Sequence, residues 1–248
     1  MSILHSVVKA IVMIVAITGL VSVSSKRAFA EEAAAKGKAK AAVAETLPKD
    51  VFPESGFRLP LPKREDFDEE GKQIFDKRVG TGARSLRGLR GPSGIRLYSP
   101  KFADYSNSVS QYLRFETGFS GRVRELAILV TAREMDSQFE WTAHEPEALK
   151  EGLPMEIVDV VKYRKSPAGL PEPDATIIQL GREMFSKKKV TSETFARAAK
   201  NFSPKQLVDL VSLMTNYQGT AVMLTTFDIQ LDPGQKPMLP MPRRNTPP

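Results

Sequence analysis

The chain has 248 residues, enough for one medium-sized domain with tails, and its 41% hydrophobic and 26% charged residues are typical of a folded soluble protein. It contains no cysteine, which excludes disulfides, thiolate catalysis, zinc–thiolate sites and lipid attachment through cysteine. The net charge is +7, of which Lys9, Lys26 and Arg27 contribute three, and the remaining +4 (7 − 3) is too dispersed to indicate a nucleic-acid-binding protein.

Residues 1–30 have the pattern of a secretory signal. Lys9 precedes an apolar run over residues 10–23, and residues 28–30 form a small-x-small cleavage site. The run is shorter than the roughly 20 residues that a membrane span needs. We therefore expect cleavage after Ala30 and a periplasmic or secreted mature protein. The alternatives are an uncleaved membrane anchor and a buried N-terminal helix.

The remaining chain divides by composition into a linker, a folded domain and a tail. Residues 31–50 are rich in alanine and lysine, and they lack an apolar face, so we expect a flexible linker. The folded domain is expected over 51–231, and the proline-rich tail 232–248 should be irregular. Within the domain, the Gly/Arg-rich segment 81–100 reads as a basic loop. It either binds an anion or pairs with surface acids.

Helix-start signals recur along the domain. Serine followed by proline occurs at Ser99 and Ser203, and both pairs favour a helix N-terminus. Further expected cap residues are Asp66, Ser120, Asp136, Asp174 and either Thr191 or Ser192. These signals predict helices over 67–79, 100–115, 121–133, 137–151, 155–163, 175–187, 193–201 and 205–227. No segment reads as a strand, so we expect an all-α domain of seven or eight helices.

The scarce residues of the domain gather in one stretch. It holds Trp141, the only tryptophan, and His144, the only histidine beyond the expected signal. Glu140 lies four positions before His144, and Glu125 lies on the preceding predicted helix, so neighbouring antiparallel helices would bring them together. A carboxylate and an imidazole that share a site can exchange protons near neutral pH. The alternatives are a structural histidine and an ordinary surface pair of Glu140 with His144.

The run RVRELAILVTAREMDSQFEWTAHEPEALKEGLP resembles the carboxymuconolactone decarboxylase-like family, which belongs with alkylhydroperoxidase D-like proteins. The motif is a glutamate in an apolar helix, then E-W-x-x-H, then an alanine–glycine–leucine helix end. The segments GLRGPSGIRLYSP, SQYLRFETGFS and LVSLMTNYQGTAVMLTTFDI extend the resemblance to roughly residues 57–240. It implies a compact alkylhydroperoxidase D-like helical bundle that assembles as a homo-oligomer, usually a trimer or hexamer.

The resemblance also implies chemistry. Alkylhydroperoxidase D-like members reduce peroxides with a C-x-x-C pair, but those positions are Ser137 and Glu140, so thiol peroxidase chemistry is not available. The family's proton-relaying glutamate and histidine correspond to Glu125 and His144. These residues imply cofactor-free acid–base catalysis, of decarboxylase, lyase or isomerase type, on a small organic acid or lactone.

The expected catalytic residues are Glu125, Glu140 and His144. Trp141 and Tyr217 are expected to line the pocket, and Arg90 or Arg124 to hold a substrate carboxylate. The alternatives are a thiol-independent, peroxide-detoxifying protein and a non-catalytic periplasmic ligand-binding protein. We expect no metal, although His144, Glu140 and Glu125 are a minor candidate ligand set. No nucleic-acid partner is expected, and no stable membrane association after signal cleavage.

Overall fold

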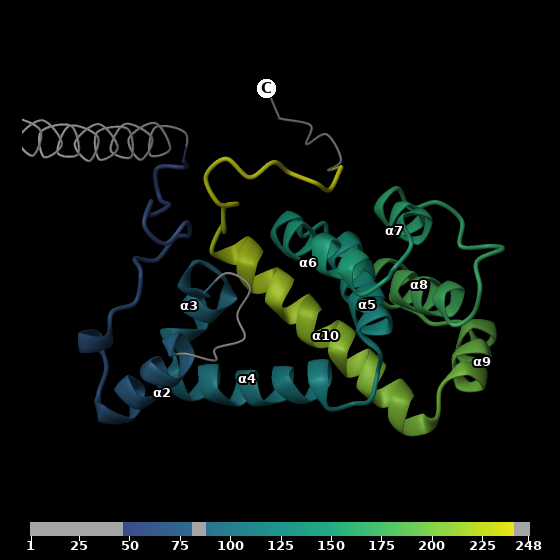
Figure 1. Cartoon of the computed structure of the whole chain (residues 1–248), viewed down its shortest axis with the longest axis horizontal. Coiled ribbons are helices and arrows are strands. Elements are labelled where there is room, and N and C mark those ends of the chain that lie inside the picture. Colours follow the sequence, from purple (N-terminus) through teal and green to yellow (C-terminus); the bar gives the residue numbers. More distant parts are fainter. Residues whose placement is uncertain (1–46, 81–87, 241–248) are drawn as a thin grey trace, which may run out of the picture. The chain divides into compact units, whose positions relative to one another are not determined.

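A computed structural model describes residues 47–80 and 88–240 of the chain. The expected signal, most of the expected linker, residues 81–87 and the last eight residues lie outside this part. The chain divides into two units, Met1–Lys49 and Asp50–Pro248, and everything described below belongs to the second. Within the described ranges the domain is all-α, as predicted, with nine helices, eight of them seven residues or longer (Figure 1).

The helices follow one another with short connections. In chain order they are α2 (Glu69–Val79), α3 (Pro92–Leu97), α4 (Pro100–Phe115), α5 (Gly121–Glu134), α6 (Gln138–Lys150), α7 (Met155–Lys162), α8 (Asp174–Arg182), α9 (Ser192–Asn201) and α10 (Pro204–Thr226). A π-helical turn, Glu183–Lys187, extends α8. The described part of the tail, up to residue 240, is irregular as predicted. Among the described helices, none combines the length and apolar character needed to cross a membrane.

Helix α5 forms the centre of the domain. It is buried almost all round, as expected for a helix that is apolar on more than one face. It packs against α6, α8 and α10, and its Leu126 and Leu129 share one core with Ile177 of α8 and Leu213 of α10. Helix α10 runs diagonally between two groups, with α2 to α4 on one side and α5 to α9 on the other (Figure 1). This arrangement places the first turns of α5 beside α6 and α10.

Several predicted helix starts are confirmed by their cap hydrogen bonds. The side chain of Ser120 accepts from the Val123 amide, and Thr191 caps α9 in the same way. Ser203 and Gln206 form a reciprocal capping box at the start of α10. Serine and threonine are favoured here because their hydroxyl oxygens satisfy amides that have no partner within the helix.

Three predicted aspartate caps are wrong. Asp66 belongs to a short 3-10 turn, and Asp68 caps α2 instead by accepting from the Gly71 amide. Asp136 has a left-handed backbone, φ 48°, and pairs with two arginines, so α6 begins after Ser137. Asp174 is the first residue of α8, and its carboxylate binds Arg122 at 2.5 Å.

The segment predicted as a basic loop contains a helix. Helix α3 is short but buries Ile95 and Leu97. A Cβ at Gly94 would lie 2.0 Å from the Leu89 carbonyl oxygen, so the close approach of the chain at this point requires glycine. The glycines therefore serve packing here, and the helix brings Arg96 into the interior of the domain.

Candidate functional site

The turn between α5 and α6 folds the two helices against each other. Glu125, in the first turns of α5, meets His144 in the second half of α6. The distance from His144 Nδ1 to Glu125 Oε2 is 2.7 Å, and only 5% and 1% of the two residues is exposed. The structure thus brings these two predicted residues together as a buried, hydrogen-bonded pair.

Glu125 has a second partner, Arg124. The Arg124 Nε lies 3.1 Å from Glu125 Oε1, and the same guanidinium also binds the Arg114 carbonyl and Glu151. Burial by itself raises the pKa of Glu125, but the hydrogen bonds and charges of His144 and Arg124 outweigh it and lower the pKa. Arg124 therefore positions and stabilises an anionic Glu125. It does not line the cavity described below, so the expectation that it holds a substrate carboxylate is corrected.

An anionic Glu125 determines which nitrogen of the His144 ring donates to it. The carboxylate can only accept, so the neutral imidazole carries its proton on Nδ1. In the neutral ring Nε2 has a free lone pair, and Nε2 makes no hydrogen bond to the described residues. Because His144 lines a cavity, this nitrogen is placed to act as a base toward a molecule bound there.

Glu140 is a buried acid in a different environment. Only 4% of the residue is exposed, and neither carboxyl oxygen has a hydrogen-bond partner in the described part of the chain. Burial raises the pKa of Glu140 to about 8, while a polar contact with Ser137, short of hydrogen-bond geometry, and the charge of Arg96 act the other way. At neutral pH the group is therefore largely protonated and can donate a proton.

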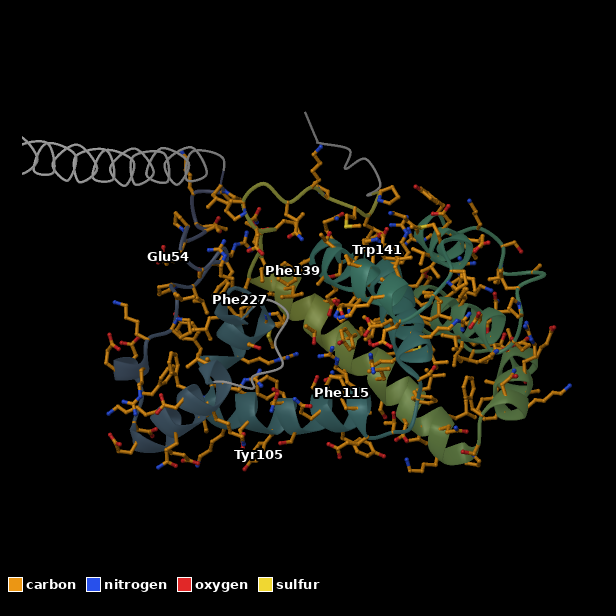
Figure 2. The ribbon with its side chains drawn as sticks, viewed as in Figure 1. Glu54, Tyr105, Phe115, Phe139, Trp141 and Phe227 are labelled. Carbon is orange, nitrogen blue, oxygen red and sulfur yellow. The ribbon has the colours of Figure 1, made fainter. Side chains whose placement is uncertain are left out.

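Glu140 and His144 face a common cavity of about 100 Å³ that lies between α2, α3, α4, α6 and α10. Tyr217 lines it as predicted, and its ring packs edge-on against His144 with centroids 5.2 Å apart. Burial raises the pKa of Tyr217, so its phenol stays neutral. Phe115 of α4 and Phe139 of α6 contribute apolar side chains to the wall of the cavity (Figure 2). The cavity has room for a small molecule beside the acid and the base.

Three arginines also line the cavity: Arg78 and Arg114, which the sequence did not single out, and Arg96, which belongs to the basic segment considered as an anion-binding loop. Each has a buried Nε with no hydrogen-bond partner. Arg78 donates to Ser93 at 2.8 Å and Arg96 to Thr220 at 2.6 Å, both neutral hydroxyls. In the two described ranges, none of the three guanidiniums pairs with a carboxylate. Burial lowers the pKa of Arg78 and Arg96, but a guanidinium remains charged in proteins. The cavity is therefore suited to an anion.

Two predicted pocket residues lie elsewhere. Trp141 is fully buried in the core, where its Nε1 donates to Glu145 and Lys162 lies over its ring (Figure 2). It does not line the cavity. It follows Glu140 by one residue, a rotation of about 100° around the helix, which turns it away from the cavity. Arg90 donates to the Pro53 and Glu54 carbonyls and pairs with Asp232. It therefore joins the chain before α2 to the chain after α10 and does not line the cavity.

Within the described ranges, no group of three potential ligand side chains is close enough to form a metal site, and this includes Glu125, Glu140 and His144. No known protein-family model matches the chain, and no curated protein matches it. The geometry of the cavity is therefore what indicates a function.

Proposed function

We propose that this protein is an enzyme that performs acid–base chemistry on a small organic anion bound beside His144. The observation that carries the proposal is the 2.7 Å bond between His144 Nδ1 and Glu125, which leaves Nε2 on the cavity side as a base. The three arginines support it, because their unpartnered Nε atoms offer donors to a substrate carboxylate. No external cofactor is needed for this step.

The step we propose is a proton transfer. Nε2 of His144 removes a proton from a carbon next to a substrate carbonyl, and the electron pair moves onto the carbonyl oxygen. Glu125 stabilises the imidazolium that forms, since its carboxylate already accepts from Nδ1. Protonated Glu140 donates its proton to the oxygen that gains the charge. Return of the first proton to another carbon, while the enol proton passes back to Glu140, completes an isomerisation. In a decarboxylation, the bond to a departing CO2 supplies the electron pair in place of the C–H bond, and protonated His144 then gives a proton to that carbon as Glu140 regains its own.

We further propose that the resemblance to carboxymuconolactone decarboxylase-like proteins reflects this shared proton chemistry. The all-α fold and the pairing of Glu125 with His144 agree with what that resemblance implies. The signal-like pattern of residues 1–30 supports export, so a periplasmic or secreted location is part of the proposal. Assembly as a homo-oligomer is also part of it, on the resemblance alone.

Hydrogen–deuterium exchange tests the proposal without knowledge of the net reaction. Purified protein in D2O is mixed with levulinate, a keto acid with acidic hydrogens, or with the γ-lactone of a hydroxy dicarboxylic acid. Proton NMR follows the loss of the substrate signal. We expect catalysed exchange in the native protein, and a fall of about 100-fold or more in His144→Ala and Glu125→Gln.

Ser110→Ala is the matched control, because Ser110 lines the same cavity without a role in the step. Circular dichroism and thermal melting show whether each variant folds. Full exchange by a folded His144→Ala protein would contradict the proposal.

A non-catalytic anion-binding protein is the second candidate, favoured by the same unpartnered arginine Nε atoms. It predicts tight carboxylate binding that survives His144→Ala, with no exchange on any substrate. Isothermal titration calorimetry beside the exchange assay separates the two.

A further inference from the structure

A second hollow lies on the outside of the domain, between α4 and α10, with a volume of about 360 Å³. Its walls are mostly apolar: Phe102, Tyr105 and Val109 of α4 face Gly219 and Met223 of α10. Tyr105 projects from α4 (Figure 2), and the three α4 residues are 48%, 69% and 51% exposed. They follow one another at spacings of three and four, so they form one continuous apolar face. We call this hollow the outer groove.

The outer groove shares part of its wall with the cavity of the candidate site. Arg96, Asn216 and Thr220 line both hollows. The 2.6 Å hydrogen bond from Arg96 Nη2 to Thr220 Oγ1 spans their junction. The polar, cationic cavity with the acid and the base therefore lies next to the apolar outer groove, with the Arg96 side chain in the wall of both.

This juxtaposition identifies a chemical class of ligand. A carboxylate next to Arg96 would find an unpartnered Nε and would lie in the same cavity as His144 and Glu140. A hydrocarbon chain attached to it would cover the exposed face of Phe102, Tyr105 and Val109 and remove that face from water. The cavity alone would bind only the carboxylate, and the outer groove alone would bind only the hydrocarbon chain.

We propose that the ligand is an amphipathic organic anion, whose carboxylate binds Arg96 in the cavity and whose hydrocarbon chain lies in the outer groove between α4 and α10. The inference rests on the proposed function for the chemistry at the carboxylate end. Binding itself can be measured without turnover.

The test titrates straight-chain sodium carboxylates of four to ten carbons into the purified protein by isothermal titration calorimetry. We expect the affinity to rise about threefold to fourfold for each added methylene until the groove is filled. Octan-1-ol and octylamine, which lack the carboxylate, are expected to bind at least tenfold more weakly than octanoate. Arg96→Gln is expected to weaken all the acids by tenfold or more.

Two variants address the groove directly. Phe102→Ala removes an apolar wall, and Gly219→Leu fills the groove at a position where an added Cβ meets no atom within 4 Å. Both are expected to lower the affinity for decanoate by about tenfold or more. The affinity for shorter acids should fall by less. Val222→Ala is the matched control, because Val222 is 52% exposed on α10 but does not line the groove. It should leave all affinities unchanged.

The outcomes separate this inference from the proposed function. An affinity independent of chain length, or equal binding of octan-1-ol and octanoate, overturns the inference even if proton exchange on short acids is observed. A rise with chain length supports it even if no exchange occurs, and then only the proposed reaction fails. If Phe102→Ala and Gly219→Leu change the oligomeric mass in light scattering and not the affinity, the groove is a contact between copies and the inference is overturned.

Discussion

At the scale of single residues, the site separates two carboxyl groups by their surroundings. Glu125 has a histidine and an arginine within 3.1 Å and is held as an anion. Glu140 lies on the next helix with no hydrogen-bond partner, and burial favours its neutral form. Two groups of the same chemical type are thus set for opposite roles, one supporting a base and the other serving as an acid.

The raised pKa of Glu140 predicts a pH-dependent stability. The pKa is about 8 in the folded chain against an ordinary value of 4.5, so the unfolded chain releases the proton first. The free energy of unfolding therefore falls as the pH rises from about 4.5 to about 8 and does not fall further above that. Glu140→Gln has no such proton. Its stability relative to the native chain should increase over this window by up to about 5 kcal/mol.

Urea denaturation at pH 5 and pH 8 checks this prediction. Glu116→Gln is the control, because Glu116 is exposed at the end of α4 and its loss leaves the cavity unchanged. Parallel stability profiles for the native chain and Glu140→Gln would mean that Glu140 ionises freely. It would then not be the acid of the site.

At the scale of helices, the packing of α8 against α5 depends on a small residue. A Cβ at Gly181 would lie 2.4 Å from Val130 of α5 and 2.7 Å from Met214 of α10. Gly181→Ala should therefore lower the free energy of unfolding by about 1 to 3 kcal/mol, through overpacking of a dense core. Gly219→Ala is the matched helical substitution, since its Cβ meets nothing within 4 Å. It should be neutral or stabilise by up to about 1 kcal/mol. Urea denaturation of both variants tests this prediction. Equal changes in the free energy of unfolding would contradict it.

Helix boundaries were predictable where they depend on neighbouring residues alone. Ser120 and Ser203 cap as expected because each cap bond closes within three residues. Asp136 failed as a cap because its carboxylate binds Arg133 at 2.8 Å and Arg164, distant in sequence, at 3.1 Å. Helix α3 was missed because the need for Gly94 arises from contact with the Leu89 carbonyl, which composition does not reveal. Cap residues thus predicted most helix starts, and the exceptions come from contacts that composition does not reveal.

Some contacts of the candidate site could likewise be predicted from the sequence, and others could not. The meeting of Glu125 with His144 follows from two consecutive antiparallel helices, so the sequence could predict it. The cavity arginines, Arg78, Arg96 and Arg114, come from three different helices, α2, α3 and α4, and only the tertiary fold brings them together. Trp141 shows the limit of reasoning by spacing, because a difference of one position along α6 separates the cavity side from the core side.

At the scale of the whole domain, the segments that flank the helices are tied to each other. The amide of Arg58 donates to the Phe227 carbonyl at 2.9 Å, and the amide of Gln230 donates to the Gly56 carbonyl at 2.8 Å. Glu54 and Phe227, labelled in Figure 2, lie in these two segments. Phe57 and Leu224 share a small core with Phe139, which lines the cavity from its other side. The chain before α2 and the chain after α10 therefore support one wall of the site.

Arg90 is one of the side chains that join these two segments, and its loss tests its role. It donates to the carbonyls of Pro53 and Glu54 at 3.0 and 2.6 Å and pairs with Asp232 at 3.2 Å. Arg90→Ala should lower the free energy of unfolding by about 1 to 3 kcal/mol. It should also increase protease cleavage within residues 50–60 and 228–240, because these segments lose their common partner. Octanoate affinity should remain, since Arg90 does not line the cavity. Arg96→Gln should give the opposite pattern, with weaker binding and little added cleavage. If Arg90→Ala lost octanoate binding but stayed stable and resistant to protease, Arg90 would have to take part in ligand binding.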